Sequence, residues 1–161
     1  MHITLGWDDL LFEDATLDYE ALLDDWRWIL NGRFRVVAGT KFGDWFMERP
    51  DGQVQFLDAI DGTIREVATS TVEFRSMINT QEKQEEWLLS PLVLTLHENG
   101  VVPASGQCYG FKLPPVLGGK VESDNVEVID LRLWVSLCGQ IHRQVQSLPP
   151  GTKISGFKTE G

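Results

Sequence analysis

The sequence predicts an α+β fold in a single domain, and three observations support this. Apolar residues recur at helical spacing over residues 18–30 and 131–147, whereas residues 34–68 combine β-branched and aromatic residues with turn signals. Strands and helices do not alternate regularly, which argues against doubly wound and barrel architectures. A length of 161 residues with 42% hydrophobic residues is enough for a real core. We expect one domain over residues 1–153 and a polar tail at 154–161.

The first predicted helix spans about residues 18–30. Its apolar side chains lie three or four positions apart, and Asn31-Gly32 is a helix stop signal. The first 32 residues contain eight acidic residues and a single Arg or Lys, so this helix has a strongly acidic surface. Three of its acids are Asp18, Asp24 and Asp25.

Residues 34–68 predict three or four strands of an antiparallel meander. Phe34–Ala38 is rich in β-branched and aromatic residues. Pro50-Asp51-Gly52 is a turn signal because Pro fixes φ and Gly accepts positive φ, and Asp61-Gly62 is a hairpin signal. The meander therefore follows the first helix directly.

Short helices follow the meander. Ser70 begins a capping box that predicts a helix over about 71–79. A second short helical segment contains Glu82, Glu85 and Glu86 and ends at Trp87-Leu88. Ser90-Pro91 has the residue types of an N-cap and a first-turn proline, and it predicts a third helix that ends near Asn99-Gly100.

Residues 106–119 hold four glycines, two prolines, Tyr109 and Phe111. This composition specifies one irregular backbone path, where rigid binding surfaces tend to lie. Gly118-Gly119-Lys120 lacks the first Gly and the final Ser or Thr of a phosphate-binding loop, so we interpret it as a tight turn.

A short strand and a long helix complete the predicted fold. Residues 126–129 are suited to a strand, and Asp130 is placed to cap a helix over about 131–147. The apolar face expected for this helix contains Leu133, Trp134, Leu137, Ile141 and Val145.

Catalytic and metal-binding patterns are weak in this sequence. Cys108 with the later His142 is a conceivable nucleophile and base, but any chain with a Cys and a later His passes this test. We interpret Cys108 as a packed loop cysteine and His142 as a residue at the flank of its helix. His and Cys do not occur at metal-ligand spacings. We expect no catalytic residue, no metal ligand and no cofactor.

The formal net charge of −10 restricts the classes of binding partner. It argues against direct nucleic-acid binding and against anionic membranes, and it suits a basic partner through electrostatic steering. The alternative is that acidity only maintains solubility.

The sequence shows no signal peptide, no apolar run near the ~20 residues that span a bilayer, and no disulfide framework, so we expect a cytoplasmic location.

Several segments together resemble the C-terminal domain of type VI secretion DNase immunity proteins, in which that domain follows a GAD-like domain. The resemblance covers roughly residues 18–153, and we expect a stand-alone domain here. Its motifs are Gly43-Asp44-Trp45-Phe46, Leu57-Asp58-Ala59-Ile60-Asp61-Gly62, Glu86-Trp87-Leu88-Leu89, Gly106-Gln107-Cys108-Tyr109-Gly110-Phe111, Pro115-Val116-Leu117-Gly118-Gly119 and Leu137-Cys138-Gly139-Gln140-Ile141-His142.

The resemblance implies a non-enzymatic protein that binds and blocks a cognate nuclease-type toxin with a basic active-site surface. Charge complementarity favours acidic side chains for that contact. The candidate partner-binding residues are Asp18, Asp24, Asp25, Glu82, Glu85, Glu86, Tyr109 and Lys112. An alternative for Tyr109 and Phe111 is that both are core residues.

Two other functions remain open from the sequence. A small-molecule-binding or regulatory domain would use residues 106–119, with Tyr109 and Phe111, to line a pocket. An enzyme would use Cys108 with His142, or carboxylates, and we rank it last.

Overall fold

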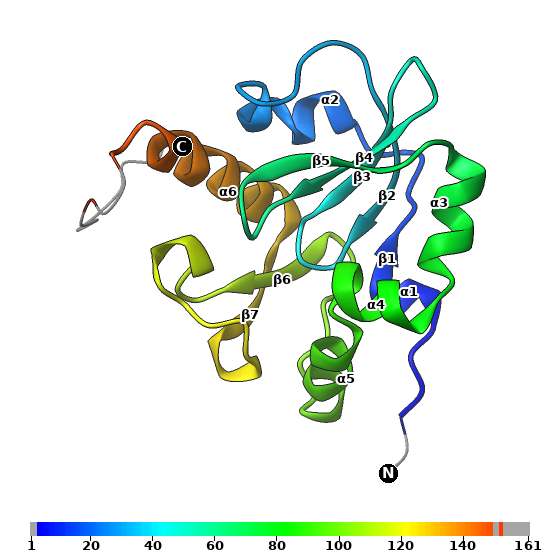
Figure 1. Cartoon of the computed structure of the whole chain (residues 1–161). Coiled ribbons are helices and arrows are strands. Elements are labelled where there is room, and N and C mark those ends of the chain that lie inside the picture. The colour runs from blue at the N-terminus through cyan, green and yellow to red at the C-terminus, as the bar shows by residue number, and fades with distance from the viewer. Residues whose placement is uncertain (1–2, 150–151, 153–161) are drawn as a thin grey trace.

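The computed structural model describes residues 3–149 and 152, and it centres on a five-stranded antiparallel sheet (Figure 1). The strands follow the order of the sequence, β1-β2-β3-β4-β5, so the sheet is a meander. Their bounds are Leu11–Phe12, Arg35–Thr40, Trp45–Glu48, Val54–Asp58 and Thr63–Ala68. The predicted meander is confirmed in its four-strand form, and β1 adds an edge strand that the sequence analysis did not predict.

An aromatic cluster fixes two helices to the sheet. Phe46 of β3 lies 4.5 Å from Phe56 of β4 between ring centroids, and 4.6 Å from Phe74. Trp87 completes the cluster at 5.3 Å from Phe46. Phe74 belongs to α3 (Thr71–Ile78) and Trp87 to α4 (Gln81–Leu88), so burying these rings docks both helices.

The three predicted short helices are confirmed, with one correction at the third. Ser90 does not cap α5 (Ser90–Glu98), because it already lies inside the helix. The residue before it, Leu89, has a left-handed backbone with φ of 53° and joins α4 to α5 directly. Because Leu89 alone separates the two helices, the chain changes direction between α4 and α5 at this residue. Pro91 lies in the first turn as predicted.

The predicted helix over 18–30 is wrong in its length. The chain forms α1 at Trp7–Leu10, α2 at Tyr19–Leu22 and a 3₁₀ turn, η1, at Asp24–Trp26. Trp26 is fully buried and its indole N–H donates to the carbonyl of Val135 over 2.9 Å. We attribute the break to the packing of this segment around α6, which outweighs the helical pattern.

The second half of the chain forms a hairpin and a long helix. β6 (Gln107–Phe111) pairs with β7 (Val126–Asp130), and α6 spans Leu131–Gln146. Asp130 caps α6 as predicted, since its carboxylate accepts from the N–H of Leu133 over 2.9 Å. The first part of the irregular segment is therefore a regular strand, and η2 (Pro115–Leu117) follows. The predicted tail at 154–161 lies outside the described residues.

The buried face of α6 differs from the predicted one. Leu133 is 57% exposed, whereas Val135 and Cys138 are buried. The helix packs against η1 as well as against β6 and β7, so its buried surface is wider than one stripe. His142 belongs to this buried surface, and its predicted position at the helix flank is wrong.

Candidate partner-binding surface

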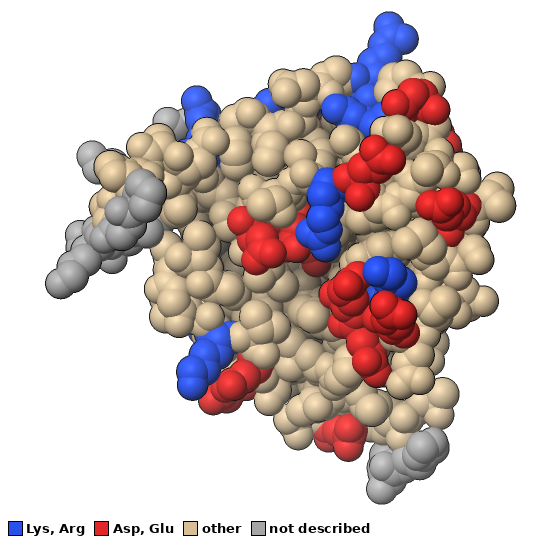
Figure 2. Space-filling view, in the orientation of Figure 1, with Lys and Arg blue, Asp and Glu red and all other residues tan. Residues whose placement is uncertain are grey.

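Three of the predicted contact residues share one helix. Glu82, Glu85 and Glu86 are all exposed on α4, and we call them the α4 acidic surface. Figure 2 shows acidic side chains gathered around one basic side chain over this helix. Lys83 pairs with Glu86 over 2.9 Å, so the surface keeps an excess of negative charge.

The position of α4 follows from its caps and its buried face. The hydroxyl of Thr80 accepts from the N–H of Lys83, which starts the helix. Trp87 and Leu88 are buried against the core, so the opposite side of the helix faces solvent. The three glutamates are thereby presented on a well-anchored element.

Two of the acids near α2 hold parts of the fold together, whereas the contacts of Glu85 with Gln81 and of Glu86 with Lys83 stay within α4. Asp18 caps α2 by accepting from the N–H of Ala21 over 3.2 Å, and Asp25 accepts a short hydrogen bond from Ser136 of α6. Asp24 is exposed and lines a shallow groove with Arg132. Asp18 and Asp25 therefore stabilise local structure whatever else they bind.

The structure does not bring the two acidic groups into one surface. α2 and η1 pack against α6, whereas α4 packs against α3 and α5. In Figure 1, α2 lies above the sheet and α4 below it.

Tyr109 is a core residue. Its side chain is fully buried, its hydroxyl donates to the carbonyl of Val101 over 2.7 Å, and burial raises its pKa to about 12. The interpretation of Tyr109 as a contact residue is thus wrong for this structure, because no part of its side chain reaches solvent. Phe111 is buried too, whereas Lys112 is exposed.

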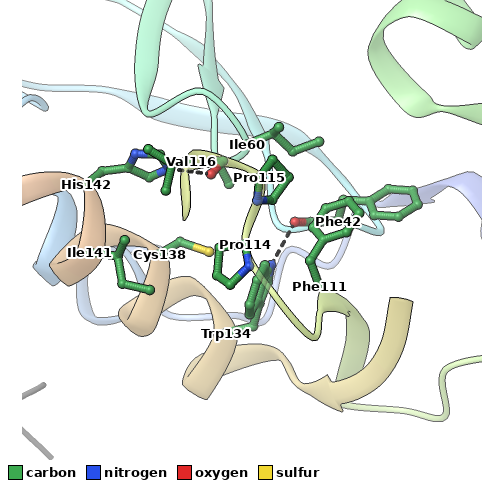
Figure 3. A pocket seen from close by; sticks show the side chains of 11 residues that line it. Phe42, Ile60, Phe111, Pro114, Pro115, Val116, Trp134, Cys138, Ile141 and His142 are labelled. Carbon is green, nitrogen blue, oxygen red and sulfur yellow. Dashed lines mark hydrogen bonds between the residues drawn. The ribbon is translucent and has the colours of Figure 1, made fainter. Parts of the chain in front are cut away.

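The pocket beside the irregular segment is too small for a metabolite. Figure 3 shows Pro114, Pro115 and Val116 facing Cys138 and other side chains of α6. The cavity volume is about 10 Å³, which is room for about one water molecule. This geometry disfavours the small-molecule interpretation of residues 106–119.

The structure also disfavours the pairing of Cys108 with His142. Burial raises the pKa of the Cys108 thiol, so the thiolate that a nucleophile needs is suppressed. His142 is bound to the carbonyl of Ala59 through Nε2 over 2.8 Å, and burial lowers its pKa.

No group of three or more His, Cys, Asp or Glu in the described part of the chain could hold a metal ion. None of the described helices has the length and apolarity to cross a bilayer.

Gly118-Gly119 is a tight turn, as predicted. Gly118 has φ of 101°, and a Cβ on Gly119 would lie 1.7 Å from the carbonyl oxygen of Leu113. The side-chain amide of Asn125 donates to the carbonyls of Leu113 and Lys120, and its oxygen accepts from the N–H of Leu113. A single side chain thus closes the loop.

The sequence analysis assigned no role to Asp44, although it lies in one of the motifs that carry the family resemblance. Its carboxylate is buried and accepts from the N–H of Ala59 over 2.7 Å and from the hydroxyl of Thr40 over 2.6 Å. His142 binds the carbonyl of the same Ala59. Three of the motifs that carry the family resemblance, those of Asp44, Ala59 and His142, therefore meet at Ala59. This meeting indicates a structural role for the three motifs.

Comparison with known proteins finds a match to an immunity-protein family over part of the chain. Residues 68–142, from the end of β5 into α6, match the family described as "T6SS immunity protein Tdi1, C-terminal". The predicted resemblance to the C-terminal domain of type VI secretion immunity proteins is confirmed over this stretch.

A solved structure with a similar chain is the crystal structure of Atu4351 from Agrobacterium tumefaciens. The two share 15% sequence identity with a TM-score of 0.48, over 75% of this chain and 60% of Atu4351. The present chain thus spans well under two thirds of that protein. No curated protein matches the chain.

Proposed function

We propose that this protein is a non-enzymatic immunity protein that binds and blocks a nuclease-type toxin. The observation that carries the proposal is the match of residues 68–142 to an immunity-protein family. The matched stretch contains α4 with its acidic surface, and it contains neither α2 nor η1. We therefore assign the primary toxin contact to the α4 acidic surface.

Electrostatics supports a basic partner. A nuclease needs Lys and Arg to hold phosphates, so its active-site surface is positive. Glu82, Glu85 and Glu86 sit on an anchored helix of a chain with net charge −10, and they can steer and occupy such a surface. Asp24 and Lys112 are exposed as well and remain secondary candidates.

The test is protection against a nuclease-type toxin, for which the genes next to this one are searched first. Co-expression of the toxin with the wild-type chain is expected to restore growth. The triple variant Glu82→Gln, Glu85→Gln, Glu86→Gln is expected to lower the association rate for the purified toxin by about 10-fold or more, because steering depends on these charges.

A matched control removes the same charge elsewhere. Glu122→Gln, Asp124→Asn and Glu127→Gln also replace three exposed acids, outside α4. This control is expected to change the rate less than threefold. Growth arrest despite co-expression, together with no binding to the purified toxin, would contradict the proposed function.

A further inference from the structure

A surface groove lies between the N-terminal segment and the end of α3. It has a volume of about 310 Å³ and is lined by Trp7, Leu11, Glu13, Arg75, Ile78 and Asn79. Leu11 and Ile78 are nearly buried and contribute apolar atoms, while Glu13 and Arg75 form an ion pair of 3.6 Å at its edge. The groove is large enough for one aliphatic or aromatic side chain.

Trp7 gives this groove an exposed aromatic wall. It is 46% exposed, and it is the one exposed aromatic side chain in the described part of the chain. Its helix α1 is fixed, since Leu10 is buried, α1 packs against α5, and the Asp9 carboxylate accepts from the N–H of Gly6 over 2.8 Å. Exposed Trp on an anchored element is a common centre of binding energy in protein interfaces.

The apolar surface continues along α3. Val72 is 80% exposed and lies on the same helix face as Arg75 and Asn79, at spacings of three and seven residues. Trp7 and the apolar part of the groove, with Val72 about one turn further along α3, expose apolar atoms of the kind that mark a protein contact.

Acidic residues lie near this groove along the chain. Glu13 lines it and Asp8 is next to Trp7. Glu82 follows the groove residue Asn79 by three positions, in the helix that also carries Glu85 and Glu86. The bases near these acids are Lys41, Arg75 and Lys83. Asn79 lines the groove, and α4 begins two residues later at Gln81. Figure 1 shows α4 after the lower end of α3, and the groove brings Trp7 of α1 to that same end at Asn79. The local excess of negative charge selects a positively charged partner.

We infer that this groove receives an apolar side chain from a basic segment of the toxin, and that Trp7 is its anchor. The inference rests on the proposed function and extends it, because it adds a specificity pocket to the electrostatic contact. In this arrangement the acids set the association rate, and the groove sets the lifetime of the complex.

The experiment measures binding of the purified, catalytically inactivated nuclease-type toxin against which the wild-type chain protects. Trp7→Ala is expected to weaken affinity by about 30-fold or more, mostly through faster dissociation. Asn79→Trp fills the groove without changing charge or removing Trp7, and it is expected to weaken affinity similarly. Thermal unfolding of each variant verifies that it is folded.

Leu133→Ala is the matched control. Leu133 is a 57% exposed apolar residue on α6, outside the groove, and its removal is expected to change affinity less than threefold. If the wild-type chain binds the toxin and both groove variants bind equally well, the groove inference is overturned while the immunity function stands. Self-association of the wild-type chain that Trp7→Ala abolishes would also overturn it, because a second copy would then be the occupant.

Discussion

At the scale of single residues, Asp44 shows how a buried ionisable group can serve the fold. Its carboxyl group links the β2–β3 turn, through Thr40, to the β4–β5 turn, through Ala59. Burial raises the pKa of Asp44 to about 7, and the nearby Asp58 adds to the rise. The protonated form therefore prevails in the folded state over a pH range where an unfolded aspartate is ionised.

This pKa shift predicts a pH dependence of stability. Between about pH 4 and pH 7 the folded state binds the Asp44 proton and the unfolded state does not, so the free energy of unfolding falls as pH rises. The contribution reaches about 1.4 kcal/mol per pH unit. In Asp44→Asn this contribution is absent, so the difference between wild type and variant in urea unfolding should change steadily from pH 4 to pH 7. A constant difference would contradict the assignment.

At the scale of elements, the loop between β6 and β7 depends on one side chain. Asn125 makes three hydrogen bonds, of 2.8 to 3.0 Å, to the backbone of Leu113 and Lys120. Gly119 lies too close to Leu113 for any side chain to fit. The irregular segment is thus specified by contacts 12 residues apart as well as by its own glycines and prolines.

Asn125→Ala is expected to lower the free energy of unfolding by about 3 kcal/mol, since each lost hydrogen bond contributes about 1 kcal/mol. Ser123→Ala, in the same short turn η3 (Ser123–Asn125), is the control and should change stability by less than about 0.5 kcal/mol. Urea unfolding measures both. Equal stability of the two variants would show that the loop holds without the amide.

The elements that the sequence predicted well are those with strong local signals. The capped helices α3 and α6 and the turn-bounded strands β2 to β5 were predicted because Ser70, Asp130 and Asp61-Gly62 act within a few residues. The break in the 18–30 helix was not predictable, because its cause is the distant carbonyl of Val135. The six acids and Lys112 in the candidate set are exposed or half-buried, and Tyr109 failed because composition does not reveal burial.

At the scale of the whole molecule, the acidic side chains are distributed unequally over the elements. The chain carries net charge −10, and its six candidate contact acids form two separate groups on different elements. One group caps α2 and contacts α6, whereas the acids of the other are exposed on α4 and make their contacts within that helix. This distribution supports the proposed contact at the α4 acidic surface.

The unequal charge distribution predicts a salt dependence of toxin binding. Raising ionic strength from about 0.05 M to 0.5 M should slow association by about 10-fold or more, because the Debye length falls and steering is screened. Dissociation should change much less, since the groove contact is apolar. Surface plasmon resonance at four salt concentrations measures both rates. A salt effect confined to dissociation would contradict electrostatic steering.

The indole contacts of Trp26 in η1 and of Trp28 just after it have a consequence for the synthesis of the protein. Trp26 donates to Val135 and Trp28 donates to Gly139, which are 109 and 111 residues further along the chain. At about 5–20 residues per second, a ribosome needs about 5–20 s to make the partners of these rings. During that time the nascent chain exposes two tryptophans that the finished protein covers. We therefore expect chaperones that bind apolar segments to contact this chain early in its synthesis. We also expect protection against the toxin to begin only after α6 has left the ribosome.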